Sequence, residues 1–465
     1  MIQRRTLLKY MASAGMLGGF GVSSSLSLAD NLNRISIQDR YSGPLWVFVN
    51  AQGGWDVTSL CDPKGYNGIS GANDPNRLNN YDSANIRLAG NIPYAPPPNS
   101  FLPGQSQYDA NLYSADTFFG KYYRQLLVIN GINCLTNSHS SGQLFNMSGS
   151  LTSGFPTFTS LLSATSAISQ PLSHITFGGY SSTSNLIPAI RINNASLRAL
   201  FEIAYPNRSS VPRLSTSRLY LPDEIIQLVA QTSVARHETL LFQQNLPNIR
   251  ESLTRLLSSR LNVSQLQSFA DNLEQSAVRP ESDFNGRNKA YKIYQQGRIA
   301  LAGFQQGVTS SVNIRLGGFD THSNHDEKHY PLLMDLLQGV DAILDEAKSR
   351  GLQDRIVLVM LSDFGRSNKY NQGNGKDHWP VSSAMLMGNS QQRILGNRVV
   401  GETSNRHEAY RLNPNDLSPD FLNSSPSSVQ LTPAHLHLSL RQLAGVENSP
   451  NSMLYQIEGQ SLPLF

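Results

Sequence analysis

The sequence predicts an α/β fold in which a doubly wound, mostly parallel sheet carries a helical insertion. Compact apolar runs at residues 45–49 and 356–361 are typical of strands that are covered on both faces. Residues 311–361 have the pattern strand, helix, strand, which predicts parallel pairing through a right-handed crossover. Because polar residues follow these strands directly, we expect a ligand crevice at the carboxyl edge of the sheet.

The first 29 residues predict a twin-arginine export signal. Arg4 and Arg5 precede a short apolar stretch, and small residues ending at Ala29 offer a cleavage site. A membrane-anchoring or amphipathic helix is the alternative, but the apolar stretch is shorter than the roughly 20 residues of a membrane span. We therefore expect residues 40–465 to form a periplasmic or secreted domain without a transmembrane segment.

The charge of the chain argues against nucleic-acid binding. The formal net charge is +4, and the predicted signal contains three positive residues, Arg4, Arg5 and Lys9, and no acid. The remaining chain therefore carries about +1, which lacks the basic footprint that binding to a phosphate backbone requires.

Two cysteines, Cys61 and Cys134, each follow a candidate strand. In an oxidising compartment they could form one disulfide, and two buried free thiols are the alternative. A single pair of cysteines does not make a structural zinc site by itself.

The other elements follow in chain order. Residues 222–306 have apolar residues at helical spacing and predict three or four helices, which we interpret as an insertion or cap. The remaining predicted elements are strands at 126–129, 311–316 and 381–388 and helices at 141–147, 331–350 and 433–445.

A glycine-rich turn after the strand at 311–316 leads to Asp320, His322 and His325. Asp320 and His322 point to the same side of an extended segment. A carboxylate beside an imidazole favours zinc, manganese or iron over magnesium or calcium. His325 is a third candidate ligand. The alternative is an aspartate that caps a turn and histidines that share an exposed helix face.

Four further polar residues and one more acid complete the candidate set. Asp363 follows a fully apolar run, so its charge needs a cation, an arginine or backbone donors. Arg366 is either that partner or a group that holds an anionic oxygen of the substrate. Asp377 and His378 lie in a glycine- and asparagine-rich loop, where functional residues are common. Asp56 follows the first strand, and for it, as for Asp377, a turn aspartate is the alternative.

Ser138 is the candidate nucleophile. It precedes the helix at 141–147, where backbone N–H groups and the helix dipole favour anions. Ser140 is the alternative hydroxyl, and His139 is a candidate ligand or base. Serines that only cap a helix are common, so an N-cap role is the simpler interpretation of this segment.

These motifs, in this order, resemble a large secreted bacterial family catalogued as domain of unknown function 1501. The motifs are the export signal, Gly53-Gly54-Trp55-Asp56, Gly318-Phe319-Asp320-Thr321-His322, Ser362-Asp363-Phe364-Gly365-Arg366 and Asp377-His378. That family resembles the alkaline phosphatase and sulfatase superfamily, which implies an alkaline-phosphatase-like α/β fold with a metal site at the strand ends. The resemblance implies metal ligands at Asp56, at Asp320 with a following histidine, at Asp363 and at His378.

The chain departs from the superfamily pattern at two ligand positions. Asn324 lies four residues after Asp320, and Phe364 directly follows Asp363; histidine is usual at both places. The segment around Ser138 also lacks the sulfatase nucleophile pattern. One divalent ion, two ions or an inactive site therefore remain open, with zinc, manganese or calcium as the candidate metals.

The leading hypothesis is an exported, metal-dependent hydrolase of phosphate or sulfate esters, with a small molecule or glycan ester as substrate. A non-catalytic exported binding protein with the same pocket is the alternative. A metal-free esterase that uses Ser138 in a triad is a third hypothesis, but the sequence has no Gly-x-Ser-x-Gly elbow. The sequence makes no prediction of oligomeric state.

Overall fold

The computed structural model describes residues 41–97, 112–166, 170–192, 197–205, 207, 219–247, 249–250, 253–254 and 263–465. The export signal predicted at residues 1–29 lies outside these ranges. The chain divides into a larger unit, residues 42–168, 172–196 and 271–465, and a smaller unit, residues 1–41, 169–171 and 197–270. Within the described ranges, no helix combines the length and the low polarity needed to cross a membrane.

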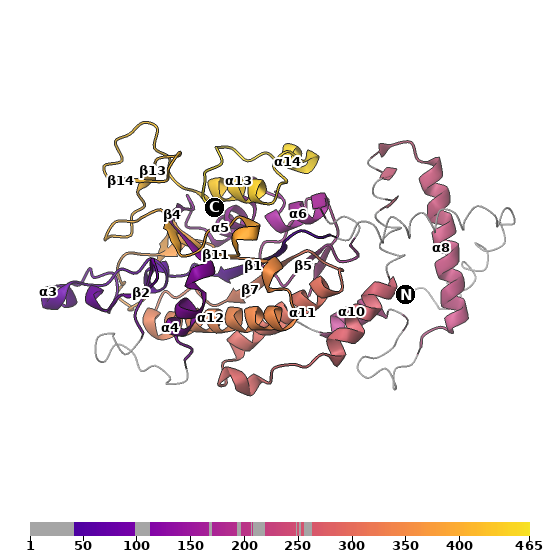
Figure 1. The fold of residues 1–465 in the computed structure, drawn as a ribbon, viewed down its shortest axis with the longest axis horizontal. Helices are drawn as coiled ribbons and strands as arrows, with labels where there is room; N and C mark the ends of the chain where they lie inside the picture. The colour runs from indigo at the N-terminus through magenta and orange to yellow at the C-terminus, as the bar shows by residue number, and fades with distance from the viewer. Residues whose placement is uncertain are drawn as a thin grey trace. The chain divides into compact units, whose positions relative to one another are not determined.

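An eight-stranded sheet forms the centre of the larger unit (Figure 1). Its strand order is β12-β4-β11-β8-β1-β7-β5-β6. The bounds are β1 Leu45–Gln52, β4 Leu126–Asn133, β5 His174–Thr176, β6 Ala189–Arg191, β7 Ser311–Gly317, β8 Ile356–Ser362, β11 Val381–Met387 and β12 Arg398–Val400. β11 runs antiparallel to both neighbours, and the other pairs are parallel. The predicted mostly parallel α/β sheet is confirmed.

β1 lies between β7 and β8 and pairs in parallel with both. The predicted direct pairing of β7 with β8 is therefore wrong: the connection through α12 (His325–Ser349) passes over one strand position. All of Leu45–Ala51 is buried, which suits this central place. As a result, the segments that contain Gly53, Asp320 and Asp363 leave three adjacent strands at one edge.

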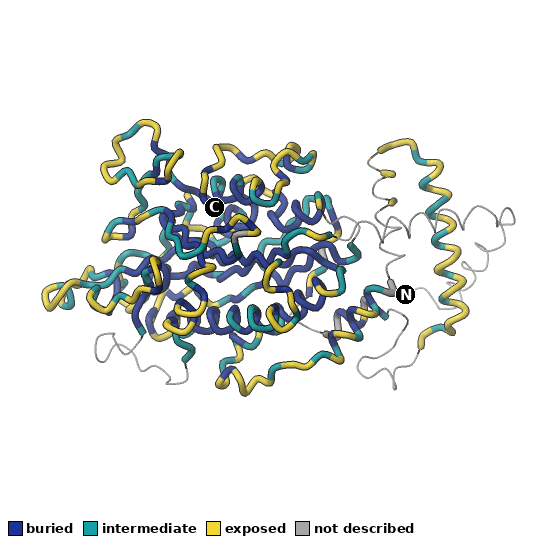
Figure 2. The backbone as a smooth tube through the Cα atoms, in the orientation of Figure 1, coloured by how far each residue is buried: buried dark blue, intermediate teal, exposed yellow. Residues whose placement is uncertain are grey.

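Helices cover both faces of the sheet (Figure 1). One face holds α5 (His139–Ser148), α6 (Phe158–Ser166) and α13 (Pro433–Leu443), and the other holds α4 (Ala115–Tyr122), α11 (Asn288–Gln305) and α12. On the first face Phe158 packs its ring 5.0 Å from that of Trp46 and 5.3 Å from that of Phe48. The sheet and the helix sides that face it are buried (Figure 2), as a doubly wound fold requires.

The segment predicted as a helical insertion, residues 222–306, divides between the two units. α8 (Asp223–Gln243) has no buried residue (Figure 2), and α10 (Val263–Gln275) follows it. α11, in contrast, packs against α12 and β7 and buries most of its length. The predicted insertion is therefore too long at its C-terminal end, because the apolar face of α11 covers the sheet.

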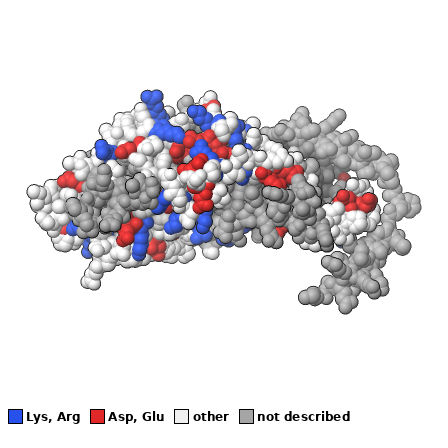
Figure 3. Space-filling view, turned by 90° about the horizontal axis from the view of Figure 1, so that it is seen from below, with Lys and Arg blue, Asp and Glu red and all other residues white. Residues whose placement is uncertain are grey.

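Shorter elements complete the described chain. They are η1 Val57–Ser59, α3 Gly68–Ala72, η2 Ser83–Asn85, β2 Arg87–Ala89, β3 Ile92–Tyr94, η4 Tyr123–Gln125, α7 Leu197–Ala204, η6 Glu281–Phe284, η7 Gln353–Arg355, β9 Gly365–Arg366, β10 His378–Trp379, η8 Ser390–Gln392, β13 Arg411–Leu412, β14 Pro419–Asp420 and α14 Pro450–Leu454. On the face that Figure 3 presents, the described acidic and basic side chains are interspersed.

Both cysteines are buried free thiols, so the disulfide that the sequence allowed is not formed. The side-chain amide of Asn146 donates a hydrogen bond to Cys134 Sγ over 3.3 Å. Burial raises the pKa of Cys134 to about 12. The thiol is therefore protonated and unreactive at neutral pH.

The crossing of α11 and α12 depends on glycine. A Cβ added at Gly339 would lie 2.5 Å from Ile293 Cβ and 2.9 Å from the carbonyl oxygen of Ala290. We predict that Gly339→Ala lowers the free energy of unfolding by about 1–3 kcal/mol through overpacking. Gly120→Ala on α4 is the control: no atom lies within 4 Å of its new Cβ, so it should stabilise by about 0.5–1 kcal/mol. Equal effects of the two substitutions in urea unfolding would contradict this account of the crossing.

Candidate metal centre

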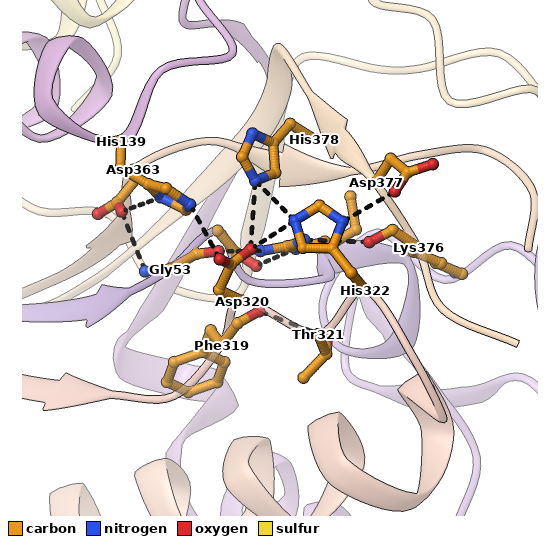
Figure 4. Close-up of polar contacts among 12 residues, drawn as sticks. Gly53, His139, Phe319, Asp320, Thr321, His322, Asp363, Lys376, Asp377 and His378 are labelled. Atoms are coloured by element: carbon orange, nitrogen blue, oxygen red, sulfur yellow. Dashed lines mark hydrogen bonds and ion pairs between the residues drawn. The ribbon is translucent and has the colours of Figure 1, made fainter. Parts of the chain in front are cut away.

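Three histidine rings converge on the carboxylate of Asp320 at the carboxyl edge of the sheet (Figure 4). One carboxylate oxygen of Asp320 lies 2.9 Å from His322 Nε2 and 3.2 Å from His378 Nε2. The other lies 3.4 Å from His139 Nε2. Asp320 and His322 follow β7, His378 begins β10 and His139 begins α5. The fold thus joins residues that are far apart in the sequence.

The opposite nitrogen of each ring is held by a hydrogen-bond acceptor. His139 Nδ1 lies 2.9 Å from Asp363 Oδ2, and His322 Nδ1 lies 2.8 Å from Asp377 Oδ1. His378 Nδ1 lies 2.7 Å from the carbonyl oxygen of Asn137. Because an ionised carboxylate or a carbonyl has no hydrogen to donate, each Nδ1 must donate one. In a ring whose only proton is on Nδ1, the lone pair of Nε2 is directed toward Asp320, as in histidine ligands of metals.

Three observations indicate that a cation fits among these atoms. His322 Nε2 and His378 Nε2 are only 3.1 Å apart, and two lone pairs at that distance repel unless positive charge lies between them. Asp363 Oδ1 and His139 Nε2 are buried and have no hydrogen-bond partner among the described residues. The ligand atoms of His139, Asp320 and His378 all lie within 4.8 Å of one another. Imidazole nitrogens beside a carboxylate are ligands that zinc, manganese and iron accept.

Asp363 and Asp377, both predicted as metal ligands, lie behind histidine rings. Asp363 is fully buried, and its Oδ2 accepts from Gly53 N at 3.0 Å and Gln143 Nε2 at 3.4 Å as well as from His139. Only its Oδ1 is left for a metal. Asp377 is exposed, and the hydrogen bond from His322 lowers its pKa. Through these contacts both carboxylates orient histidine rings; their direct metal role stays a prediction, for which Asp363 keeps Oδ1.

Arg366 is completely buried, and its fork is occupied by protein groups. It donates to the carbonyl oxygens of Gly53, Gly54 and Lys376 and, over 2.8 Å, to Asp320 Oδ1. Burial raises the pKa of Asp320, but the hydrogen bond from Arg366 and the positive charge of its guanidinium outweigh it and lower this pKa to about 2. The predicted contact of Arg366 with substrate is therefore not formed by this conformation, in which Arg366 keeps Asp320 ionised.

Asp56 and His325 belong to a second, fully buried cluster. The carboxylate of Asp56 accepts from Lys376 Nζ at 2.6 Å, from Thr58 N at 3.0 Å and from His325 Nε2 at 2.9 Å. The coulombic attraction of Lys376 and the hydrogen bond from His325 overcome burial and hold the pKa of Asp56 well below its usual value. A buried carboxylate that is satisfied in this way needs no metal.

The histidines of this cluster form a closed ring of hydrogen bonds with Asp56. The N–H of Asp56 must donate to His329 Nε2 at 2.8 Å. Thr321 Oγ1 then lies 2.9 Å from His329 Nδ1 and 2.8 Å from His325 Nδ1. Burial lowers the pKa of both histidines. When both imidazoles are neutral, only one placement of the protons satisfies every hydrogen bond of this closed set. In that placement both nitrogens of His325 are used.

The metal role of Asp56 and His325 stays a prediction, which the contacts of the second cluster do not support because both side chains are satisfied by protein groups. Lys376, which pairs with Asp56, was missed by the sequence interpretation. The one available signal was that a buried acid needs a cation, and a lysine stands directly before the Asp377-His378 motif.

Ser138, the predicted nucleophile, is exposed and begins α5 as its N-cap. Its hydroxyl lies 3.1 Å from that of Ser140, and no hydrogen bond joins it to the described histidines of the metal cluster. The adjacent His139 reaches the cluster instead.

Comparisons with known proteins agree with the predicted resemblance. A family model described as "Protein of unknown function (DUF1501)" matches residues 229–436, which include Asp320, His322, Asp363 and His378. The resemblance to that family is confirmed. No curated protein matches the chain.

Solved structures with detectable similarity include sulfatases and an alkaline phosphatase. PsFucS1 sulfatase from Pseudoalteromonas sp. has 9% identity and a TM-score of 0.36, covering 92% of this chain and 73% of its own. Ps i-CgsB in complex with k-i-k-neocarrahexaose has 8% identity and a TM-score of 0.34, covering 89% and 74%. A TAB5 alkaline phosphatase mutant with Mg bound has 10% identity and a TM-score of 0.31, covering 77% and 94%. Similarity of this size assigns neither substrate nor metal to this chain.

We predict that Lys376→Met lowers the free energy of unfolding by about 3–5 kcal/mol, because it leaves Asp56 charged and buried without its partner. Lys121→Met is the matched control, since Lys121 pairs with Asp341 and Asp345 at the surface. That loss should be at most about 1 kcal/mol. Chemical denaturation measures both, and similar losses would contradict the buried pair as the stronger interaction.

Stability should also fall with acidification. His325 and His329 have lowered pKa values in the folded state, so the unfolded chain binds their protons first as pH drops below about 6.5. The stability that the two histidines contribute is complete above that pH and declines below it. The stability that Asp56 contributes declines below about pH 4, because the pKa of Asp56 is also lowered in the folded state. We predict a shallower loss of stability between pH 7 and 5 in His329→Gln. His237→Gln on α8 is the control and should lose stability with pH as steeply as the wild type. Equal slopes in the wild type and both variants would exclude the buried histidines as the cause.

Proposed function

We propose that this chain is an exported, metal-dependent hydrolase of phosphate or sulfate esters. The observation that supports the proposal is the geometry of three Nε2 atoms and one carboxylate, each ring locked by an acceptor on its far side. His322 and Asp320 each keep 46% of the side chain exposed, so one side of the cluster is open to a substrate. Catalytic zinc sites keep a position open to water or substrate and can expand to five-coordinate, so the ester would occupy a fifth position beside these four ligands.

The residues of the site have two roles: some would bind the ion, and others orient the ligands. Asp320, His139, His322 and His378 would hold one divalent cation. Once bound, such a cation polarises an ester oxygen and lowers the pKa of a water molecule. Asp363, Asp377 and the carbonyl of Asn137 fix the ring tautomers, and Arg366 keeps Asp320 ionised through the hydrogen bond described above.

One ion is favoured over two. The Phe364 ring lies 4.5 Å from the ring of His378 and 4.8 Å from that of His139, so an apolar group occupies the place where the superfamily pattern has another histidine. Water is favoured over Ser138 as the nucleophile, because no base contacts the Ser138 hydroxyl among the described residues. The phosphate or sulfate ester class is supported by the motif resemblance.

Metal analysis and turnover test the proposal together. Protein purified without chelator should contain about one equivalent of zinc or manganese and should hydrolyse an aryl phosphate or aryl sulfate. Asp320→Asn and His378→Gln should lose the metal and at least about a hundredfold in kcat/KM. Asp377→Asn, which acts through His322, should weaken metal affinity by about 10–100-fold.

His329→Gln is the control, because His329 belongs to the second cluster, and it should keep its metal. Bound metal without turnover of either ester class would favour the alternative, a non-catalytic exported binding protein. Absence of metal from the wild-type protein, even after zinc is added back, would exclude the proposed centre.

A further inference from the structure

Polar side chains continue along the same edge of the sheet beyond the metal cluster. In the sheet order β1-β7-β5-β6, Asn50 is opposite Arg315. Arg191 is opposite Thr176, which pairs with Asn313, two residues before Arg315 on β7. None of these residues takes part in the metal cluster. Their position near the carboxyl ends of the strands is where ligands of open α/β sheets bind.

Two arginine side chains meet over Gly178, directly after β5. A Cβ added at Gly178 would lie 3.3 Å from Arg315 Nη1 and 3.4 Å from Arg191 Nη2. The φ of Gly178 is +124°, which side-chain-bearing residues rarely adopt. Glycine at this position therefore leaves room for both guanidinium groups beside the backbone.

The two arginines lack an acidic partner. Among the described residues, neither side chain forms an ion pair or a hydrogen bond, and Arg315 Nε is buried without a partner. Two like charges placed together are unfavourable by themselves. The arrangement becomes favourable when an anion with several oxygens accepts hydrogen bonds from both forks.

Gly179, next to Gly178, lies close to side chains that reach the metal cluster. A Cβ at Gly179 would lie 3.5 Å from Asn50 Nδ2 and 3.7 Å from Gln143 Oε1. Gln143 Nε2 in turn lies 3.4 Å from Asp363 Oδ2, the oxygen that holds His139. Asn50 Oδ1 and Gln52 Oε1, two residues apart on β1, are also buried and have no partner among the described residues. These oxygens can accept hydrogen bonds from substrate hydroxyl groups.

We infer that Arg191 and Arg315 form an anion subsite that binds a second anionic group of the substrate, next to the ester held at the metal cluster. The inference rests on the proposed function and narrows its substrate class. The substrate is a hydroxyl-rich molecule, such as a sugar, that carries a sulfate, phosphate or carboxylate in addition to the ester that is cleaved.

Calorimetric titration of the zinc-loaded full chain tests the subsite with four probes: glucose 6-sulfate, glucose 6-phosphate, glucuronate and neutral glucose. At least one anionic probe should bind ten times or more tightly than glucose, and the preferred probe identifies the anion. Arg191→Ala and Arg315→Lys should each weaken that binding at least tenfold. Arg315→Lys keeps the positive charge but loses the fork, and circular dichroism checks that it folds.

Arg124→Ala is the matched control, and this variant should bind the probes like the wild type. Arg124 is exposed in η4, just before the start of β4. Because β4 is parallel to β8, Arg124 lies at the edge of the sheet opposite the metal cluster. Binding of the anionic probes no tighter than glucose, or wild-type affinity in both arginine variants, would overturn the subsite. The same samples are assayed for aryl sulfate and aryl phosphate hydrolysis. Arginine-dependent binding without hydrolysis overturns the proposed function alone, and hydrolysis with arginine-independent binding overturns the subsite alone.

Discussion

The candidate site depends on one constraint: a neutral imidazole can offer an unprotonated Nε2 to a cation only if its proton is on Nδ1, where an acceptor must hold it. Asp363, Asp377 and the carbonyl of Asn137 supply those acceptors. They come from three different segments, so the constraint is met only after the sheet has formed. Without these acceptors each imidazole could flip or change tautomer. Nothing would then hold His322 Nε2 and His378 Nε2 at a separation of 3.1 Å.

The chain contains two groups of aspartate and histidine, and the negative charge of the aspartate is balanced differently in each. Asp56 is fully buried, and an ammonium, backbone and hydroxyl donors and a neutral histidine satisfy it. Asp320 is partly exposed and retains atoms that a cation can use. Lys376 joins the two groups, because its Nζ pairs with Asp56 while its carbonyl oxygen accepts from Arg366. The buried ion pair thereby anchors the loop that presents Asp377 and His378.

Local patterns in the sequence predicted the parts of the structure that local physics determines. The apolar runs at 45–49 and 356–361 are strands, and Asp320 and Asp363 follow strands that end at the same edge of the sheet, with β1 between them. The insertion of β1 between β7 and β8 depends on long-range packing, which no short window encodes. The same holds for α11. Its helical spacing of apolar residues could be recognised in the sequence, but its packing against the sheet and α12 could not.

The roles within the site were harder to predict than its location. An aspartate next to a histidine in sequence has the same pattern whether it binds a metal, orients a ring or pairs with a lysine. Asp377 and Asp56 show the difference: the first lies behind His322, and the second is neutralised by Lys376. Only the three-dimensional arrangement of donors distinguishes these cases, and the contribution of His139 likewise depends on where α5 meets the sheet.

X-ray absorption spectroscopy at the zinc edge of the loaded protein tests the central claim most directly. The account predicts a first shell of three imidazole nitrogens at about 2.0–2.1 Å and at least one oxygen, from the carboxylate of Asp320, at about 2.0–2.2 Å. A first shell with at most one imidazole, or one made up only of oxygen ligands, would contradict the convergence of His139, His322 and His378 on a single ion.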